Sequence, residues 1–144
     1  MIIKNYESKN IYMGRLSHNS DLLEEITQII NEKNIKTGSV SIIGAIYGLK
    51  IGFFKQDEKK YVFLDDIYSD KPFEIASCNG NISIKDGKPF PHLHIVASDR
   101  LGNCYGGHLM NGTKVFACEF IIHEFSGEEL VRGIDEVTKL PLWV

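Results

Sequence analysis

Three histidines, close together in the sequence, are the residues best suited to chemistry. His92 and His94 occur in the segment His-Leu-His, and His108 follows a pair of glycines. Imidazole is the commonest side-chain ligand for metals, and residues two apart on a β-strand point to the same face. On a strand, His92 and His94 would therefore be able to reach one ion at metal–nitrogen distances of about 2.0–2.1 Å.

A third ligand comes from His108 if the chain turns at residues 99–102 and returns beside a strand at residues 92–98. Gly106 and Gly107 favour this arrangement, because glycine lets two backbones approach closely. Three histidines and a water molecule form the pattern of an open zinc site, in which the bound water is acidified toward neutral pH. The alternative is a sheet face that carries two surface or core histidines and no metal.

The other two histidines are expected to lie apart from this group. His18 falls in a turn before a helix, and His123 lies on a later strand beside Glu124. We interpret both as solvent-exposed or packing residues.

Two carboxylates in otherwise apolar strand patterns, Glu74 and Glu119, are the weak catalytic candidates. Either could orient a histidine ligand or act as a general base if its side chain faces the histidines. The alternative for each is an exposed carboxylate at a strand edge. The sequence lacks a Gly-x-Ser-x-Gly elbow, a Walker loop and a His-Glu-x-x-His motif. Gly80 and the pair Gly106-Gly107 fit a β-bulge or turn better than a phosphate-binding loop.

The elements that must position these residues follow from hydrophobic periodicity and turn residues. Asn19, Ser20 and Asp21 are N-cap candidates for a helix over residues 21–33, whose apolar residues recur every three and four positions. Alternating or apolar runs between turn residues predict strands. These are expected at residues 10–17, within 38–54, and at 60–64, 73–78, 80–85, 92–98 and 114–124. Asp86-Gly87 predicts a hairpin turn, and the partner of strand 114–124 is expected at residues 129–132 or in a longer segment to 142.

The length and composition are those of one globular domain that spans residues 1–144. The chain is 43% apolar and 24% charged, which is ordinary for a folded protein. Its formal net charge is −3, and its 16 basic residues are scattered. Because nucleic-acid backbones are bound by clustered Lys and Arg, nucleic acid is not the expected partner of this domain alone.

Cysteine usage and hydropathy favour a cytoplasmic protein. Cys78, Cys104 and Cys118 are odd in number and lack Cys-x-x-Cys spacing, and the first residues contain no apolar run typical of a secretion signal. The thiols are expected to behave as small buried hydrophobic side chains. The apolar stretch at residues 38–54 is interrupted by four glycines and Lys50, and it falls short of the roughly 20 apolar residues that span a bilayer. No membrane segment is predicted.

Nearly the whole chain resembles the plant and prokaryote conserved (PPC) domain. The resemblance rests on Phe73-Glu-Ile-Ala-Ser-Cys-Asn-Gly-Asn-Ile-Ser, on Asp86-Gly-Lys-Pro-Phe-Pro-His-Leu-His-Ile-Val, and on Gly106-Gly-His-Leu with Glu119 in the following strand. The helix at residues 21–33 and the segment Ser39-Val-Ser-Ile-Ile-Gly-Ala-Ile also fit. The combination is much more specific than any one motif.

The resemblance implies an α+β fold, in which a mostly antiparallel sheet and one main helix form two layers, and assembly into a homotrimer. In prokaryotic members, the histidines that match His92, His94 and His108 resemble a metal site near the subunit boundary, which is usually taken to hold zinc. Another divalent transition metal would suit the same ligands. Plant members carry an AT-hook outside the domain, which accounts for the DNA-binding name of the family. This sequence contains no AT-hook.

The favoured hypothesis is a homotrimeric metal-binding protein that binds a small ligand or assists hydrolysis, and whether it is an enzyme stays open. The alternative is a DNA-binding or protein-interaction module in which the histidines serve packing only. The apolar C-terminal segment Leu140-Pro-Leu-Trp-Val would either cover a surface between subunits or fold back on its own sheet.

Overall fold

A computed structural model describes residues 1–64 and 70–144. Within these residues the chain forms one helix and ten strands. In chain order they are β1 (Glu7–Arg15), α1 (Leu22–Glu32), β2 (Gly38–Tyr47), β3 (Ile51–Lys55), β4 (Lys60–Phe63), β5 (Pro72–Lys85), β6 (Lys88–Ser98), β7 (Cys104–Leu109), β8 (Lys114–Ser126), β9 (Arg132–Ile134) and β10 (Pro141–Trp143).

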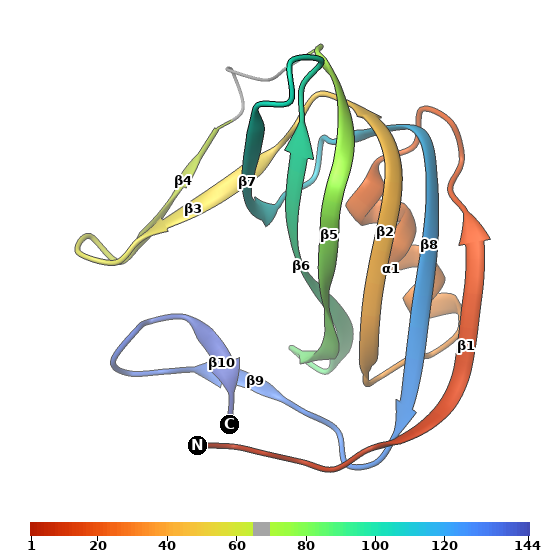
Figure 1. The fold of residues 1–144 in the computed structure, drawn as a ribbon. Coiled ribbons are helices and arrows are strands. Elements are labelled where there is room, and N and C mark those ends of the chain that lie inside the picture. The colour runs from red at the N-terminus through yellow and green to blue at the C-terminus, as the bar shows by residue number, and fades with distance from the viewer. Residues whose placement is uncertain (65–69) are drawn as a thin grey trace.

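Eight of the described strands form one antiparallel sheet in the order β1-β8-β2-β5-β6-β7-β3-β4. The strands β9 and β10 form a separate two-stranded sheet. Figure 1 shows α1 behind β2 and β8, on one face of the large sheet, and the β3–β4 hairpin projecting from its far end. This architecture confirms the α+β fold expected from the sequence, with a mostly antiparallel sheet and one main helix.

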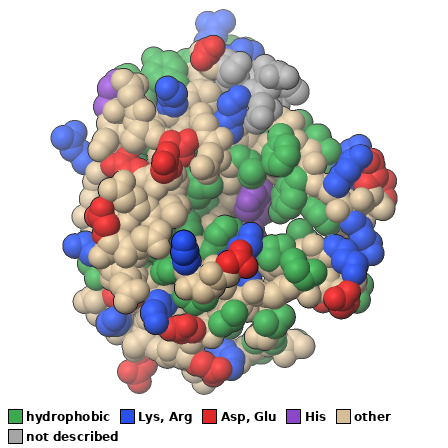
Figure 2. Space-filling model, turned by 180° about the vertical axis from the view of Figure 1, so that it is seen from behind, with side chains coloured by type: hydrophobic (Ala, Val, Ile, Leu, Met, Phe, Trp, Pro, Cys, Tyr) green, Lys and Arg blue, Asp and Glu red, His purple; other side chains and the backbone are tan. Residues whose placement is uncertain are grey.

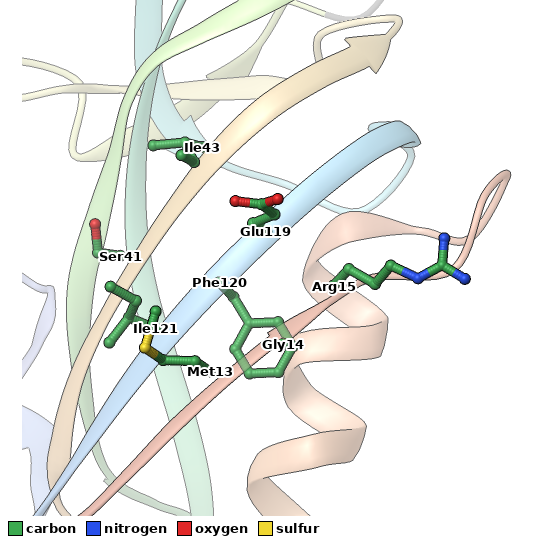
Figure 3. Close-up of a pocket in the computed structure, with 8 residues that line it drawn as sticks. All are labelled: Met13, Gly14, Arg15, Ser41, Ile43, Glu119, Phe120 and Ile121. Atoms are coloured by element: carbon green, nitrogen blue, oxygen red, sulfur yellow. The ribbon is translucent and has the colours of Figure 1, made fainter.

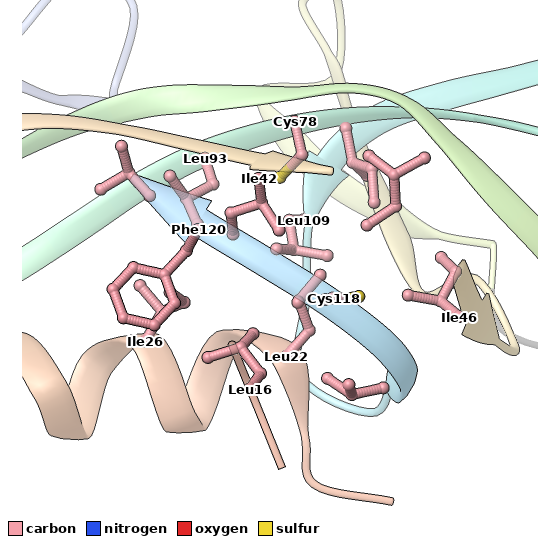
Figure 4. Packing of buried hydrophobic residues seen from close by; sticks show 14 of the residues in the cluster. Leu16, Leu22, Ile26, Ile42, Ile46, Cys78, Leu93, Leu109, Cys118 and Phe120 are labelled. Atoms are coloured by element: carbon pink, nitrogen blue, oxygen red, sulfur yellow. The ribbon is translucent and has the colours of Figure 1, made fainter. Parts of the chain in front are cut away.

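The helix α1 forms because its apolar residues make one stripe that the sheet buries. Leu22, Ile26 and Ile30 are each 0% exposed and belong to the main core, which Figure 4 shows between the helix and the strands. Asp21 is the N-cap, and its carboxylate accepts a hydrogen bond from the backbone N–H of Glu24 at 2.9 Å. In residues 1–64 and 70–144, no helix has the length and apolar character that crossing a bilayer requires.

The large sheet has a covered face and an uncovered face. On β6, Leu93 and Ile95 are buried in the core beneath α1, whereas His94 and Val96 point to the opposite face. Directly paired residues share a face, so one row of side chains crosses the uncovered face from strand to strand. In sheet order this row is Met13, Ile121, Ser41, Asn79, His94 and His108.

Gly80 allows β5 and β6 to approach each other closely. β5 is a single strand, where separate strands at residues 73–78 and 80–85 were expected. The bulge or turn predicted at Gly80 is wrong, because Gly80 pairs regularly with Leu93 and the bulge lies between Ile75 and Ser77. A Cβ atom at Gly80 would overlap the backbone carbonyl of His92, which explains the need for glycine.

The end of the chain differs from the sequence-based prediction. β8 was expected to pair with residues 129–132 or with a segment to 142, but its two edges are occupied by β1 and β2. Residues 132–143 therefore pair among themselves as the hairpin of β9 and β10. The hairpin is anchored at its base, where the backbone N–H of Ile84 donates to the carbonyl of Leu130 at 2.8 Å.

The three cysteines are free, and they occupy different environments. Cys78 and Cys118 are buried in the core, as expected, whereas Cys104 is exposed at the start of β7. Burial raises the pKa of Cys78 to about 12 and that of Cys118 to about 11. The expectation that the thiols are buried therefore holds for two of the three.

Candidate metal centre

The structure brings His92, His94 and His108 together on the uncovered face. His92 and His94 lie two residues apart on β6, and His108 on β7 is directly paired with His94. One ring nitrogen from each residue lies within 4.8 Å of those of the other two. The ring centroids are 4.9 Å apart for His92 and His108 and 5.2 Å apart for His92 and His94. A metal ion bound to all three would complete this arrangement.

Two glycines allow β7 to bring His108 to this position. A Cβ atom on Gly106 would lie 2.8 Å from the carbonyl oxygen of Ile95 on β6. A Cβ atom on Gly107 would lie 2.8 Å from the carbonyl oxygen of Gly52 on β3. Both contacts are too short for a real side chain, so β7 fits between its neighbours because these residues have none. The bulge or turn predicted at this glycine pair is wrong, because both glycines pair regularly with β6. The return of the chain beside residues 92–98, expected from the sequence, is confirmed.

The protonation states of the histidines suit metal binding. Burial lowers the pKa of His92 to about 4, and the nearby charges of His108, Arg132 and His94 act in the same direction. Burial likewise lowers the pKa of His108 to about 4, with further effects from His94, Arg132 and Lys85. Near neutral pH both imidazoles are therefore uncharged, which is the form that ligates metals.

One ring nitrogen of the three histidines lacks a hydrogen-bond partner among the described residues. The Nδ1 atom of His108 is buried and has no hydrogen-bond partner in the described part of the chain. Buried polar atoms are nearly always satisfied, so an orphan of this kind needs an explanation. A bond from this nitrogen to a metal ion would explain why it has no hydrogen-bond partner. The residues present therefore fit a bound ion.

Arg132 from β9 lies directly beside the histidines. Its Nη2 atom is 3.3 Å from Nδ1 of His92 and donates to Oδ1 of Asn81 at 2.9 Å. Its Nε atom donates to Oγ of Ser83 at 2.8 Å, and Nη1 donates to the carbonyl of Pro141 at 2.9 Å. The guanidinium is thereby fixed in place, and all four of these partners are uncharged groups near neutral pH.

Two hairpins enclose the histidines. On one side, the ring of Tyr61 on β4 lies 5.6 Å from that of His108. On the other, β9 and β10 bring Arg132 and Trp143 against a pocket of about 450 Å³ that His92 also lines. Figure 2 shows a histidine surface in a hollow between hydrophobic side chains, seen from behind. Lys59 links the two hairpins through a hydrogen bond from Nζ to the carbonyl of Val137 at 3.0 Å.

The structure does not bring Glu74 or Glu119 to the histidines. Glu119 lies on β8, three strands from β6, which corresponds to roughly 14 Å at a strand spacing of about 4.8 Å. It lines a separate groove with Met13, Ile43 and Ile121, shown in Figure 3. Glu74 is paired with Ser98, which is about 13 Å along β6 from His94. Within one chain, neither carboxylate can contact an ion at the histidines.

The two remaining histidines lie elsewhere, in agreement with the sequence-based interpretation. His18 is exposed, and its Nδ1 atom is 2.9 Å from the carbonyl of Phe116. His123 on β8 has its Nε2 atom 2.8 Å from Oγ of Ser8. Both rings make ordinary surface contacts.

Sequence reasoning missed Arg132 and Trp143. The only available signal was the apolar segment at residues 140–144, for which folding back on the chain's own sheet was one of two options. In the structure this segment folds back as β10 onto β9, in a two-stranded sheet separate from the large one, so that Trp143 pairs with Arg132 and the guanidinium lies 5.7 Å from the indole ring. The other option, a surface between subunits, stays a prediction. The position of a lone arginine 40 residues after His92 carried no pattern that would have assigned it to the site.

Comparisons with known proteins agree on the fold. The model of the Plants and Prokaryotes Conserved (PCC) domain matches residues 3–126. A solved structure from Archaeoglobus fulgidus, described as a metal-containing protein, is 38% identical, with a TM-score of 0.92 over 100% of this chain and 99% of that one. A plant- and prokaryote-conserved protein from Pyrococcus horikoshii is 30% identical, with a TM-score of 0.90 over 100% of this chain and 97% of that one.

A third solved structure carries a different name. A protein from Bacteroides thetaiotaomicron with a provisional DNA-binding name is 25% identical, with a TM-score of 0.84 over 96% of each chain. A comparison with curated proteins finds no match. The described structures therefore share the fold under two functional names, one referring to metal and one to DNA.

Proposed function

The chain belongs to the Plants and Prokaryotes Conserved domain family, and from this premise we propose that it is a metal-binding protein whose ion is held by His92, His94 and His108. The observation that carries the proposal is the convergence of three imidazole nitrogens within 4.8 Å of one another. The orphaned Nδ1 atom of His108 supports it. The metal-containing description of the Archaeoglobus fulgidus protein, 38% identical, points in the same direction.

We propose zinc as the metal. Imidazole ligands suit zinc as well as copper, iron and nickel, and three histidines with a fourth position open to solvent or ligand form a common zinc arrangement. His94 is exposed, whereas His92 and His108 are partly buried, so the group is accessible from the uncovered face. Another divalent transition metal remains the alternative for the same three ligands.

The proposed role is small-ligand binding or metal-assisted hydrolysis. A zinc ion bound here would supply Lewis acidity, which polarises a ligand oxygen and makes a water molecule more acidic. The chain's own residues would contribute the enclosure by Tyr61, Arg132 and Trp143. Glu74 and Glu119 were candidate proton acceptors, and their distance from the histidines means that such a role would require a neighbouring subunit.

Metal analysis of protein purified without an affinity tag tests the proposal. We expect about one zinc per chain in the parent and a loss of most of it in His94→Ala, because ligand removal weakens a three-ligand site strongly. His123→Ala is the matched control, since His123 lies on the same sheet but bonds to Ser8, and its metal content should equal that of the parent. A parent without stoichiometric metal would contradict the proposal.

DNA binding is the second candidate function, favoured by the name of the Bacteroides thetaiotaomicron protein. The net charge of −3 argues against it, because most of the affinity for the DNA backbone comes from clustered Lys and Arg residues that neutralise phosphates. Duplex DNA binding measured across a salt series decides between the two. A steep fall in affinity with salt would support phosphate contacts, whereas weak binding with little salt dependence would leave the metal role.

Our proposal includes a single domain that forms a cytoplasmic homotrimer. Exposed apolar side chains on the uncovered face support assembly, since Met13 is 75% exposed, Ile43 59% and Ile121 42%. Patches of this kind on folded proteins commonly mark interaction surfaces. Three free cysteines fit a reducing compartment.

A further inference from the structure

We infer that the pocket beside His92 binds a small carboxylate with an apolar body, and that Arg132 holds its carboxylate group next to the three histidines. The inference rests on the metal function proposed above and adds the class of ligand to it. Three features of the site support it: the charge around the histidines, an unused hydrogen-bond donor and the apolar walls of the pocket.

The surroundings of the histidines are positively charged. Arg132 is half-buried, and no acidic side chain in the described residues forms an ion pair with it. The Nη2 atom of Arg132 lies 3.3 Å from Nδ1 of His92. A divalent ion on the histidines would raise the positive charge further. A ligand that complements this positive charge would be an anion.

The guanidinium of Arg132 is held in place by several contacts. It lies 5.6 Å from the ring of Phe90 and 5.7 Å from that of Trp143, in addition to its bonds to Ser83, Asn81 and the carbonyl of Pro141. Fixing a cation in this way removes the loss of side-chain freedom that usually opposes ligand binding. A rigid, uncompensated arginine beside candidate metal ligands therefore favours recognition of a negatively charged group.

Trp143, which lines the same pocket, carries an unused donor. Its Nε1 atom is buried and has no acceptor among the described residues. Indole N–H groups can only donate, and buried donors without acceptors are rare. A carboxylate has two oxygens, so it can accept from the indole and face the guanidinium at the same time.

The walls of the pocket define the rest of the ligand. The pocket has a volume of about 450 Å³, and its apolar lining includes Ile2, Leu142 and the ring of Trp143. A volume of this size holds a small organic molecule. Because much of this lining is apolar, a carboxylate with an apolar body fits the pocket better than a compact inorganic phosphate does.

The pocket residues from β9 and β10 lie outside the segment that the family model matches. The family model ends at residue 126, whereas Arg132, Leu142 and Trp143 all belong to the hairpin of β9 and β10. The metal ligands and the proposed carboxylate site thus come from different parts of the chain.

Calorimetric titration with benzoate tests the inference on the full-length, zinc-loaded protein. We expect benzoate to bind the parent and its Kd to rise by at least about tenfold in Arg132→Gln, because hydrogen bonds to charged groups are the strong ones. Trp143→Phe keeps the ring and removes the N–H, so its Kd should rise by a smaller factor, about threefold or more. Arg100→Gln removes an exposed arginine in the turn before β7 and should bind benzoate as the parent does.

Zinc content, measured on every sample, distinguishes failure of the proposed metal function from failure of the carboxylate-binding inference. If the parent holds no zinc, the proposed function fails and this inference fails with it. If the parent and Arg132→Gln hold equal zinc but bind benzoate equally well, this inference alone fails. Where Arg132→Gln does not fold, the Trp143→Phe result decides. Neutral benzyl alcohol should bind at least about tenfold more weakly than benzoate, and tighter binding of inorganic phosphate than of benzoate would overturn the assignment to a carboxylate.

Discussion

His94 and His108 are directly paired residues on neighbouring strands, and their ring centroids lie 5.5 Å apart. Because side chains alternate along a strand, a one-residue slip of β7 would turn His108 toward the core. The geometry of the candidate metal centre is therefore a property of strand register. Glycines at the closest approaches of the strands help to hold that register.

Gly80→Ala is expected to disturb the site through the backbone. The added Cβ atom would overlap the carbonyl of His92, so β5 and β6 must separate locally, at a cost of about 1–3 kcal/mol in the free energy of unfolding. Zinc content should fall as well, because His92 moves. Denaturant unfolding and metal analysis measure both effects. Ser77→Ala, an exposed substitution on the same strand, is the control, and equal behaviour of the two variants would contradict this account.

Glu124 is expected to make the fold sensitive to acid. Its side chain is 5% exposed and accepts hydrogen bonds from Lys9 and Asn10, each at 2.7 Å. Burial alone would raise the pKa of Glu124, but these bonds outweigh it, and the pKa lies below its ordinary value of 4.5. A lowered pKa in the folded state contributes stability above the unfolded-state pKa of about 4.3. That contribution is lost as the pH falls through the folded-state value.

Glu124→Gln mimics the protonated state and tests this effect. Near neutral pH the variant should be less stable than the parent by about 1–3 kcal/mol, since charged hydrogen bonds are removed. The difference should shrink as the pH falls below about 4.3. Urea unfolding at a series of pH values measures it. The exposed Glu119→Gln should match the parent throughout, and a Glu124→Gln difference that does not change with pH would refute the explanation.

The uncovered face is expected to assemble three chains. Light scattering should give three times the 16.3 kDa chain mass for the parent. Ile121→Asp places a charge beside the exposed apolar side chains of Met13 and Ile43 and should shift the mass toward that of one chain, because burying an unpaired charge is costly. Leu101→Asp, at a side chain 74% exposed in a turn, should leave the mass unchanged. A parent that runs as a monomer would rule out the trimer.

The thiols are expected to differ in reactivity. Cys104 is exposed, whereas burial raises the pKa of Cys78 to about 12 and that of Cys118 to about 11. Thiolate is the reactive form, so a disulfide reagent should modify one thiol per folded chain rapidly and all three only after unfolding. Cys104→Ser should abolish the rapid phase. Rapid modification of two or more thiols in the folded parent would contradict the burial described above.

Much of the fold could be predicted from the sequence because its signals are local. The apolar stripe and N-cap fix α1, and alternation places His92 and His94 on one face of β6. The turn at residues 99–102 and the two glycines before His108 predicted that it could join them, and the resemblance to a known family strengthened that expectation. The convergence of the three nitrogens could then be stated in advance, and the structure bears it out.

The sequence-based predictions that were wrong concern contacts between residues far apart in the sequence, which depend on the arrangement of the whole sheet. Gly80 looked like a bulge, because a glycine in a strand marks either a bulge or a close approach, and only the position of His92 on the next strand distinguishes them. The pairing of β8 was wrong because β1, far away in sequence, occupies the edge that the final residues would have needed. Arg132 was missed for the same reason, since its contact with His92 spans separate hairpins.

The hairpin of β9 and β10 lies beyond the segment that the family model matches, yet it supplies Arg132 to the histidines. Two parts of one centre can therefore be changed separately, because the three histidines lie in the matched segment and Arg132 lies in the hairpin that follows it. A relative that kept the histidines and differed in this hairpin would hold the same ion and accept a different molecule. Sorting such relatives by the sequence of their final hairpin, rather than by overall identity, would group them by what they bind.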